Sequence, residues 1–204
     1  MIGETIRTEF EALKNDFETI RQQIEDDVVR TELYKGEFYE LTPYSYQRNG
    51  CKQGKPVKRP DPVKNTKNLC IYGFNNQNQI VEVKVGCSIE NQFYHTFLYY
   101  TDNLVKSILY DNGKHLMNVC HNFFEGGKLK RLQLCGSHGS REENYIYKEN
   151  ALTHIEIKQY DIDGKSGSDL VHIFQYQDDG DLESITKSFS NGYSEIIYKT
   201  KKGC

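Results

Sequence analysis

The chain lacks several features that would place it quickly. It contains no tryptophan, and no apolar run reaches the roughly 18 residues that a membrane-spanning helix needs. Its first residues carry charge and have no apolar core of the kind found in a secretory signal. All four prolines precede residue 63, so proline interrupts no strand in the last two thirds of the chain. We therefore expect a cytoplasmic protein without a membrane segment.

Cysteine and charge restrict the function classes further. Because disulfides are rare in the cytoplasm, we expect free and mostly buried thiols at the six cysteines, which are Cys51, Cys70, Cys87, Cys120, Cys135 and Cys204. The formal net charge is −3, with four basic and nine acidic residues in 1–34 and eight basic and three acidic residues in 35–67. A chain without an overall basic excess is not expected to bind nucleic acid.

The first segment, residues 1–34, has the apolar spacing of a helix. Steps of three or four residues separate Ile6, Phe10, Leu13, Phe17, Ile20, Ile24 and Val28. The spacing predicts one long amphipathic helix from about residue 3 to about residue 32. Such a stripe can cover a sheet or form a coiled-coil dimer, so the chain is expected to be a monomer or a helix-mediated dimer. Covering a sheet is favoured, because the stripe is shorter than four heptads and contains two phenylalanines.

Residues 35–67 hold all the prolines and most of the basic excess, which predicts an irregular connection and favours a solvated linker. From residue 68 to residue 204 the pattern changes to a two-residue apolar alternation, which predicts an antiparallel β-repeat sheet. Together the three segments are interpreted as a single domain.

The β-rich segment contains an internal repeat. Each unit has an aromatic residue, a polar turn and an aliphatic residue, and a further aliphatic follows three residues later, or four in the second unit. The five units span 72–83, 98–108, 122–132, 145–155 and 174–185. Each is expected to be a hairpin in which the aromatic and the aliphatic residue pair across the strands.

A second set of turns alternates with the repeats, at 110–114, 135–144, 160–169 and 190–193. Together they predict about ten consecutive antiparallel strands in a β-meander. A broad sheet cannot leave both faces wet, so it must curl or be covered. The expected fold is therefore mainly β: a half-open, barrel-like curved sheet with the N-terminal amphipathic helix packed on it.

Residues 176–182 (YQDDGDL) combine an aromatic, an acidic pair, glycine and leucine, and residues 124–129 (FEGGKL) are one residue shorter. Tyr-Asp itself occurs at 110–111 and 160–161. Over about residues 70–200 the chain resembles the YD repeats of RHS-type proteins. It is also similar to small cytosolic immunity and antitoxin proteins of bacterial toxin systems, which are built on comparable hairpin-repeat sheets.

This resemblance implies a non-enzymatic protein that binds a cognate toxin domain and neutralises it by occlusion, without a cofactor. Two alternatives stay open. One is a hydrolase with its site inside the curled sheet, and the other is an RHS-like structural segment.

Few residue sets suggest chemistry. Cys120 and His121 are adjacent, so in a strand they point to opposite faces and cannot act on each other. Cys135 and His138 have a chelating spacing but no second tight pair, so no metal site is predicted. Residues 161–169 (DIDGKSGSD) lack the glycine and glutamate positions of a calcium loop and are interpreted as a polar turn.

Acidic residues are concentrated in the last repeats. A charged rim of this kind could steer a basic partner, such as the active cleft of a nuclease toxin. The candidate partner-binding residues are Asp161, Asp163, Asp178, Asp179, Asp181 and Glu183.

Overall fold

The computed structural model describes residues 4–57 and 66–200. In these ranges three helices are present: α1 (Glu4–Ala12), α2 (Phe17–Asp27) and α3 (Ser45–Arg48). The same ranges contain thirteen strands: β1 (Arg30–Lys35), β2 (Lys55–Pro56), β3 (Leu69–Phe74), β4 (Ile80–Gly86), β5 (Phe93–Tyr100), β6 (Leu104–Tyr110), β7 (Leu116–Glu125), β8 (Lys128–Gly136), β9 (Gly139–Lys148), β10 (Ala151–Tyr160), β11 (Leu170–Tyr176), β12 (Leu182–Phe189) and β13 (Ser194–Lys199).

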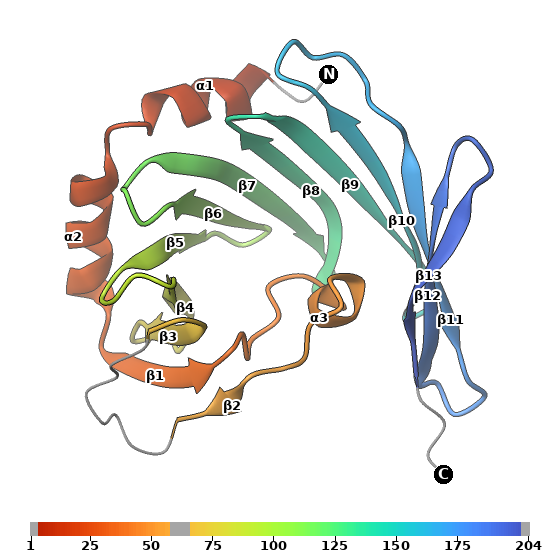
Figure 1. The fold of residues 1–204 in the computed structure, drawn as a ribbon, viewed down its shortest axis with the longest axis horizontal. Coiled ribbons are helices and arrows are strands. Elements are labelled where there is room, and N and C mark those ends of the chain that lie inside the picture. Colours follow the sequence, from red (N-terminus) through yellow and green to blue (C-terminus); the bar gives the residue numbers. More distant parts are fainter. Residues whose placement is uncertain (1–3, 58–65, 201–204) are drawn as a thin grey trace.

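All these strands form one antiparallel sheet. From β13 back to β3 each strand pairs with its neighbour in the chain, and β1 and then β2 continue the sheet beyond β3. The sheet curls without closing, because β13 and β2 lie at its two ends and do not pair (Figure 1). The predicted mainly β, half-open meander is therefore confirmed, and the sheet also takes up strands from residues before 68.

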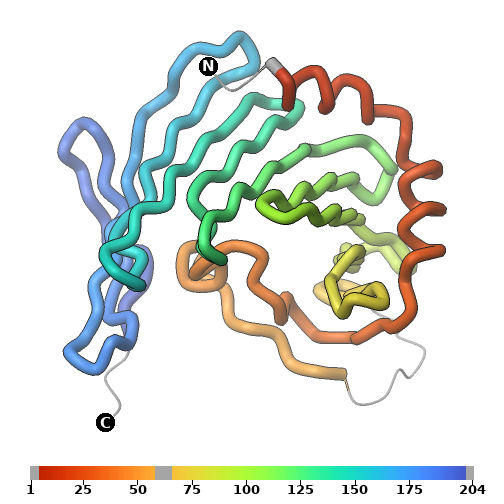
Figure 2. Tube along the Cα trace, turned by 180° about the vertical axis from the view of Figure 1, so that it is seen from behind, coloured from red at the N-terminus to blue at the C-terminus, as the bar shows by residue number. Residues whose placement is uncertain are grey.

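The curl gives the sheet two different faces. Helices α1 and α2 run along the outside of the curve, and we call the side they cover the outer face (Figures 1 and 2). The chain from residue 36 to residue 54, which includes α3, passes across the inside of the curve, and we call it the inner strap. The side of the sheet that the strap crosses is the inner face.

The five predicted repeats are the hairpins β3–β4, β5–β6, β7–β8, β9–β10 and β11–β12. In four of them the predicted aromatic and aliphatic residues are direct cross-strand partners, namely Phe74 with Ile80, Phe124 with Leu129, Tyr147 with Leu152 and Tyr176 with Leu182. In the second unit Tyr100 pairs with Val105 instead of Leu104. The hairpin repeat is thus confirmed, except that the aromatic of the second unit pairs with the residue after the predicted aliphatic.

The prediction of one long helix over residues 3–32 is wrong. The chain leaves the helical conformation between α1 and α2, and β1 begins at Arg30. Two short helices can follow the curved outer face, where α1 packs on β7 and β8 and α2 packs on β4 and β5. The break also frees the carbonyl of Leu13, which accepts a 2.7 Å hydrogen bond from the Tyr110 hydroxyl.

The helices are fixed to the outer face by their apolar stripe. Ile6, Phe10 and Phe17 are almost fully buried, and the Phe17 ring lies against Phe97 and Tyr110. The stripe therefore covers a sheet, as favoured from its spacing, and these side chains are not available for a coiled-coil seam.

The inner strap is not the solvated linker that its composition favours. Tyr46 is 8% exposed and the side chain of Arg48 is 7% exposed, because both lie against the sheet. Residues 58–65 of the predicted connection lie outside the described residues.

Cys51, Cys70, Cys87, Cys120 and Cys135 are free thiols, and Cys70, Cys120 and Cys135 are buried, as expected. Cys204 lies outside the described residues. Among the described residues, no helix has the length and apolar character needed to cross a membrane.

Candidate functional site: a cavity under the inner strap

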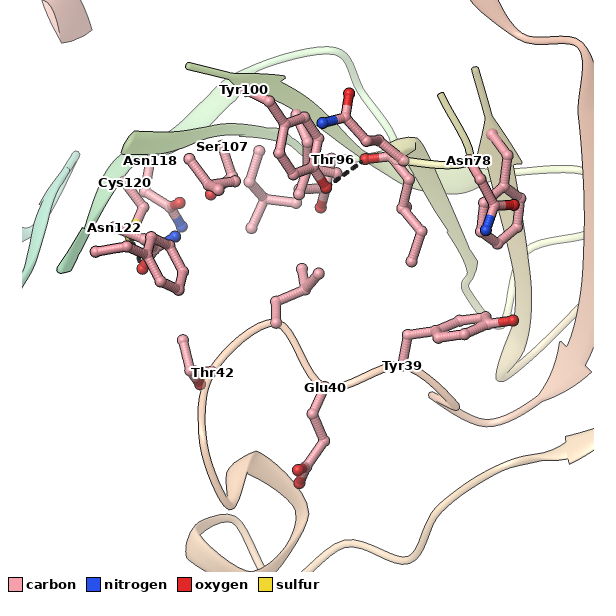
Figure 3. A pocket seen from close by; sticks show the side chains of 18 of the residues that line it. Tyr39, Glu40, Thr42, Asn78, Thr96, Tyr100, Ser107, Asn118, Cys120 and Asn122 are labelled. Carbon is pink, nitrogen blue, oxygen red and sulfur yellow. Dashed lines mark hydrogen bonds between the residues drawn. The ribbon is translucent and has the colours of Figure 1, made fainter. Parts of the chain in front are cut away.

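The inner face and the inner strap line a cavity of about 790 Å³ that is partly open to solvent. Figure 3 shows its two walls, with Tyr39, Glu40 and Thr42 of the strap on one side and strand residues on the other. The volume falls within the range of about 300–1,000 Å³ that is usual for ligand pockets. We call this space the inner cavity.

The inner cavity has an aliphatic and aromatic lining into which neutral polar groups are set. The apolar part comes from Phe74, Ile80, Leu98, Val105, Leu109, Phe124 and Leu134 on the sheet, with Leu41 on the strap. The polar part comes from Asn78, Gln79, Thr96, Ser107, Asn118 and Asn122. Primary amides both donate and accept hydrogen bonds, so this lining matches a ligand that carries amide or hydroxyl groups on an apolar body.

Alternation along the strands places these polar groups. On β7, Asn118, Cys120 and Asn122 are two residues apart and share the inner face, whereas Val119 and His121 point to the outer face. Asn122 is only 5% exposed, and its amide oxygen accepts a weak hydrogen bond from the Cys120 thiol at 3.7 Å. A buried amide of this kind is expected to be hydrogen-bonded whenever the site is filled.

The charged groups at the inner cavity are engaged elsewhere. The carboxylate of Glu32 accepts hydrogen bonds from the hydroxyls of Tyr34 and Tyr39, at 2.8 and 2.7 Å. The bond to Tyr39 comes first among the causes that hold the pKa of Glu32 below its ordinary value. Glu40 points away from the strands in Figure 3, and its carboxylate accepts from the backbone N–H of Tyr46 at 3.2 Å. The guanidinium of Arg30, the remaining charged group of the described lining, pairs with Glu32 and donates to the amide oxygen of Asn78 at 2.6 Å. The polar groups left without such a partner are therefore neutral.

Cys120 is the one thiol in the described lining of the inner cavity. Burial raises the pKa of this thiol to about 12, so it stays protonated and is a poor nucleophile. His121, its neighbour, bonds Glu9 of α1 at 2.7 Å on the outer face, as strand alternation predicts. No histidine belongs to the described lining, and the carboxylate that acts on this thiol, Glu143, is already paired with Arg48 and Arg141.

One buried arginine fixes the far end of the strap. Arg48, at the end of α3, donates to the Glu143 carboxylate of β9 at 2.9 Å and to the Tyr145 hydroxyl at 3.4 Å. Burial alone would raise the pKa of Glu143, but Arg48 and then Arg141 beside it hold that pKa below its ordinary value. Breaking such a buried pair costs about 3–5 kcal/mol, so the strap is anchored and the cavity wall is preformed.

The predicted acidic residues do not gather in one patch. Asp161 and Asp163 lie in the turn before β11, whereas Asp178, Asp179 and Asp181 lie in the turn after it. The seven residues of β11 separate the two turns by roughly 20 Å. All five are exposed, and Glu183 is partly exposed on β12. Their role in partner binding stays a prediction, now for two separate acidic turns.

The other candidates lie in ordinary structural positions. Cys135 is fully buried on the outer face, whereas His138 is exposed in the turn between β8 and β9. Within the described chain, no three His, Cys, Asp or Glu side chains are placed to hold a metal ion. Residues 161–169 form a turn in which Asp161 accepts from the backbone N–H of Lys165 at 2.8 Å, as interpreted from the sequence.

The inner cavity and its arginine anchor were not predicted. A usable signal exists in β7, where Asn118 and Asn122 occupy positions whose neighbours two residues away are apolar or weakly polar. No local sequence pattern predicts the position of the inner strap, because Arg48 and Glu143 lie 95 residues apart in the sequence.

No family model matches the chain, and comparisons with curated proteins and with solved structures returned no match.

Proposed function

We propose that this chain is a non-enzymatic binding protein that receives a segment of a partner protein in the inner cavity. The observation that carries the proposal is the preformed cavity of about 790 Å³, whose available polar groups are neutral amides and hydroxyls. Such groups complement the backbone amides of an inserted loop, and the apolar wall accepts its side chains.

For the partner we propose a toxin domain of a bacterial toxin system, which the protein neutralises by occlusion as an immunity or antitoxin protein. The resemblance of the hairpin repeats to YD repeats and to immunity proteins supports this choice. The cavity chemistry supports it too, since Cys120 is held protonated and no histidine belongs to the described lining. An inner cavity that binds a loop of the toxin domain can block the active cleft of the toxin without any chemical reaction.

The test compares two serine variants on opposite faces of the sheet. Ser107→Phe on β6 fills the inner cavity, whereas Ser188→Phe on β12 adds the same ring to the outer face. Binding of the toxin domain encoded beside this protein's gene is measured by calorimetry, and neutralisation by growth rescue. We expect Ser107→Phe to weaken binding at least about tenfold, a loss of about 1.4 kcal/mol, and to abolish rescue.

The control variant is expected to bind and rescue as the unmodified chain does. Circular dichroism and thermal unfolding of both variants are measured to check that each keeps the fold. Unchanged binding in Ser107→Phe, or no binding of the toxin domain by the unmodified chain, contradicts the proposal.

The acidic turns make a separate contribution in this proposal, by steering a basic partner. Replacing Asp178, Asp179 and Asp181 by asparagine is expected to slow association about tenfold at low salt and to leave dissociation unchanged. The matched change of Asp161 and Asp163 tests the turn at the other end of β11. If both variants associate with the partner as fast as the unmodified chain does, and the rate does not depend on salt, the acidic turns do not steer the partner.

The size of the inner cavity also favours a second candidate, a small neutral organic ligand. Native mass spectrometry of the protein purified from its own source distinguishes the two. A small molecule that stays bound, and that Ser107→Phe excludes, supports this candidate over an inserted loop.

A further inference from the structure

A second cavity lies at the other end of the inner face, beyond α3. It measures about 210 Å³ and shares none of its described lining residues with the inner cavity. The lining residues come from α3 and its C-terminal neighbour and from strands β9 to β13: Arg48, Asn49, Arg141, Gln159, Leu170, His172, Lys187 and Ile197. We call it the basic cavity, because three of these side chains are cationic.

The positive charge of the basic cavity is only partly balanced. Glu143 is shared between two guanidiniums, since Arg48 binds one of its carboxylate oxygens and Arg141 binds the other. Lys187 has a looser partner in Glu195, 3.4 Å away and 41% exposed. Three cations therefore face two carboxylates, and one of those carboxylates lies toward solvent. The imbalance favours an anion in this cavity.

Two hydrogen-bond donors on residues that line the basic cavity have no partner among the described residues. The Nε atom of Arg141 is fully buried and has no hydrogen-bond partner among the described residues. A buried donor left unpaired costs about 1–3 kcal/mol, so it is expected to have a partner when the protein works.

His172 supplies the other donor. It is 7% exposed, and its Nδ1 atom accepts a 3.1 Å hydrogen bond from Nε of Arg48, which assigns the ring proton to Nε2. Burial and the neighbouring Arg48 lower the pKa of His172 to about 4, so the ring is neutral at pH 7. A neutral ring with a free N–H, inside a positive field, suits an anionic oxygen better than a cation.

We propose that the basic cavity binds a phosphate group, either as inorganic phosphate or carried on a small molecule. The Arg141 guanidinium, the Lys187 ammonium and the His172 Nε2–H provide donors from three strands, which suits the several oxygens of a tetrahedral anion. A volume of about 210 Å³ holds such a group together with a few waters, since each water takes about 30 Å³. The site is independent of what occupies the inner cavity.

The experiment follows the His172 ring by NMR, and thermal unfolding of the full chain, in inorganic phosphate and in chloride at equal ionic strength. An anionic charge within about 4–6 Å is expected to raise the pKa of His172 by one to three units and to raise the unfolding temperature in a saturable way. Lys187→Gln is expected to weaken phosphate binding about tenfold, because a hydrogen bond to a charged group is lost.

Lys158→Gln is the matched control, because Lys158 is exposed on β10 and carries the same charge on the outer face. It is expected to bind phosphate as the unmodified chain does. An equal response to acetate overturns the assignment to phosphate. No response of His172 to millimolar phosphate, or the same affinity in Lys187→Gln, overturns the site itself.

Discussion

Acidification is expected to destabilise the protein through His172 before its carboxylates titrate. The ring is buried between β10 and β12 and bonds Arg48 only in its neutral form. The charged and titratable groups that face it are Arg48 from α3, Arg141, Glu143 and Tyr145 from β9, and Lys187 from β12. Burial comes first and Arg48 second in lowering the pKa of His172 from 6.5 to about 4.

The sign and size of the effect follow from proton linkage. The folded-state pKa lies below the unfolded one, so between pH 4 and pH 6.5 the unfolded chain binds a proton that the folded chain does not. The free energy of unfolding is therefore highest above pH 6.5 and falls as the pH is lowered. Each unit of difference is worth about 1.4 kcal/mol, which gives a full loss of about 3 kcal/mol and a loss of about 2 kcal/mol between pH 8 and pH 5.

Urea unfolding at a series of pH values from 8 to 4.5, at fixed ionic strength, measures this loss. With a typical urea dependence of about 2 kcal/mol per molar, the midpoint falls by about 1 M between pH 8 and pH 5. His172→Gln keeps an acceptor for Arg48 and removes the titration, so its midpoint is expected to stay nearly level over the same range. Equal slopes for the variant and the unmodified chain between pH 7 and pH 5 would refute the reasoning.

Two further predictions concern the buried ion pair on the inner face and the last residue of strand β4. Glu143→Gln leaves Arg48 and Arg141 without their shared carboxylate and is expected to cost about 3–5 kcal/mol in urea unfolding, with partial recovery when Arg48→Met is added. Gly86→Ala places a methyl group against the backbone carbonyl of Thr66, so about 1–3 kcal/mol should be lost, seen as a fall of about 3–9 °C in Tm. If adding Arg48→Met restores none of the stability lost in Glu143→Gln, the argument for the buried pair is contradicted. If Gly86→Ala leaves Tm unchanged, the argument for the close contact with Thr66 is contradicted.

The hairpins could be predicted from sequence because their information is local. An aromatic residue, a short polar turn and an aliphatic residue lie within a dozen residues, and neighbouring strands of the chain pair throughout β3 to β13. The three-residue step between the two aliphatics of a repeat does not fit the two-residue alternation of a regular strand, and the structure explains why. Leu129 and Leu132 belong to one core cluster although they are an odd number of positions apart, because the β7–β8 register shifts by a bulge between Phe123 and Phe124.

The second repeat differs from the other four in its aliphatic spacing, and it also lacks the bulge that they have. Its aliphatics, Leu104 and Ile108, are four residues apart, and the β5–β6 pairing runs without a register shift. An odd step therefore marks a bulged hairpin and an even step marks a regular one. The spacing of aliphatics in this chain thus encodes where the sheet bends as well as where it turns.

The helix break and the inner strap could not be predicted, because both depend on the shape of the finished sheet. The apolar spacing continues through Leu13 without interruption, and only the curvature of the outer face requires two helices there. The strap is held by Arg48, whose partners on β9 and β11 lie more than 90 residues away in sequence. Neither contact has a local pattern.

The two faces of the sheet are packed differently, and this difference places the candidate site on the inner face. On the outer face α1 and α2 bury the apolar side chains of the central strands, so those positions are used for stability. On the inner face the strap covers the same strands yet leaves about 790 Å³ unfilled, with Asn118 and Asn122 where leucine would close the gap. A pocket of this kind leaves apolar side chains of the sheet in contact with water, and buried amides add their own cost. A sheet selected only to fold would have filled this space, so we infer that the inner cavity is kept for an occupant.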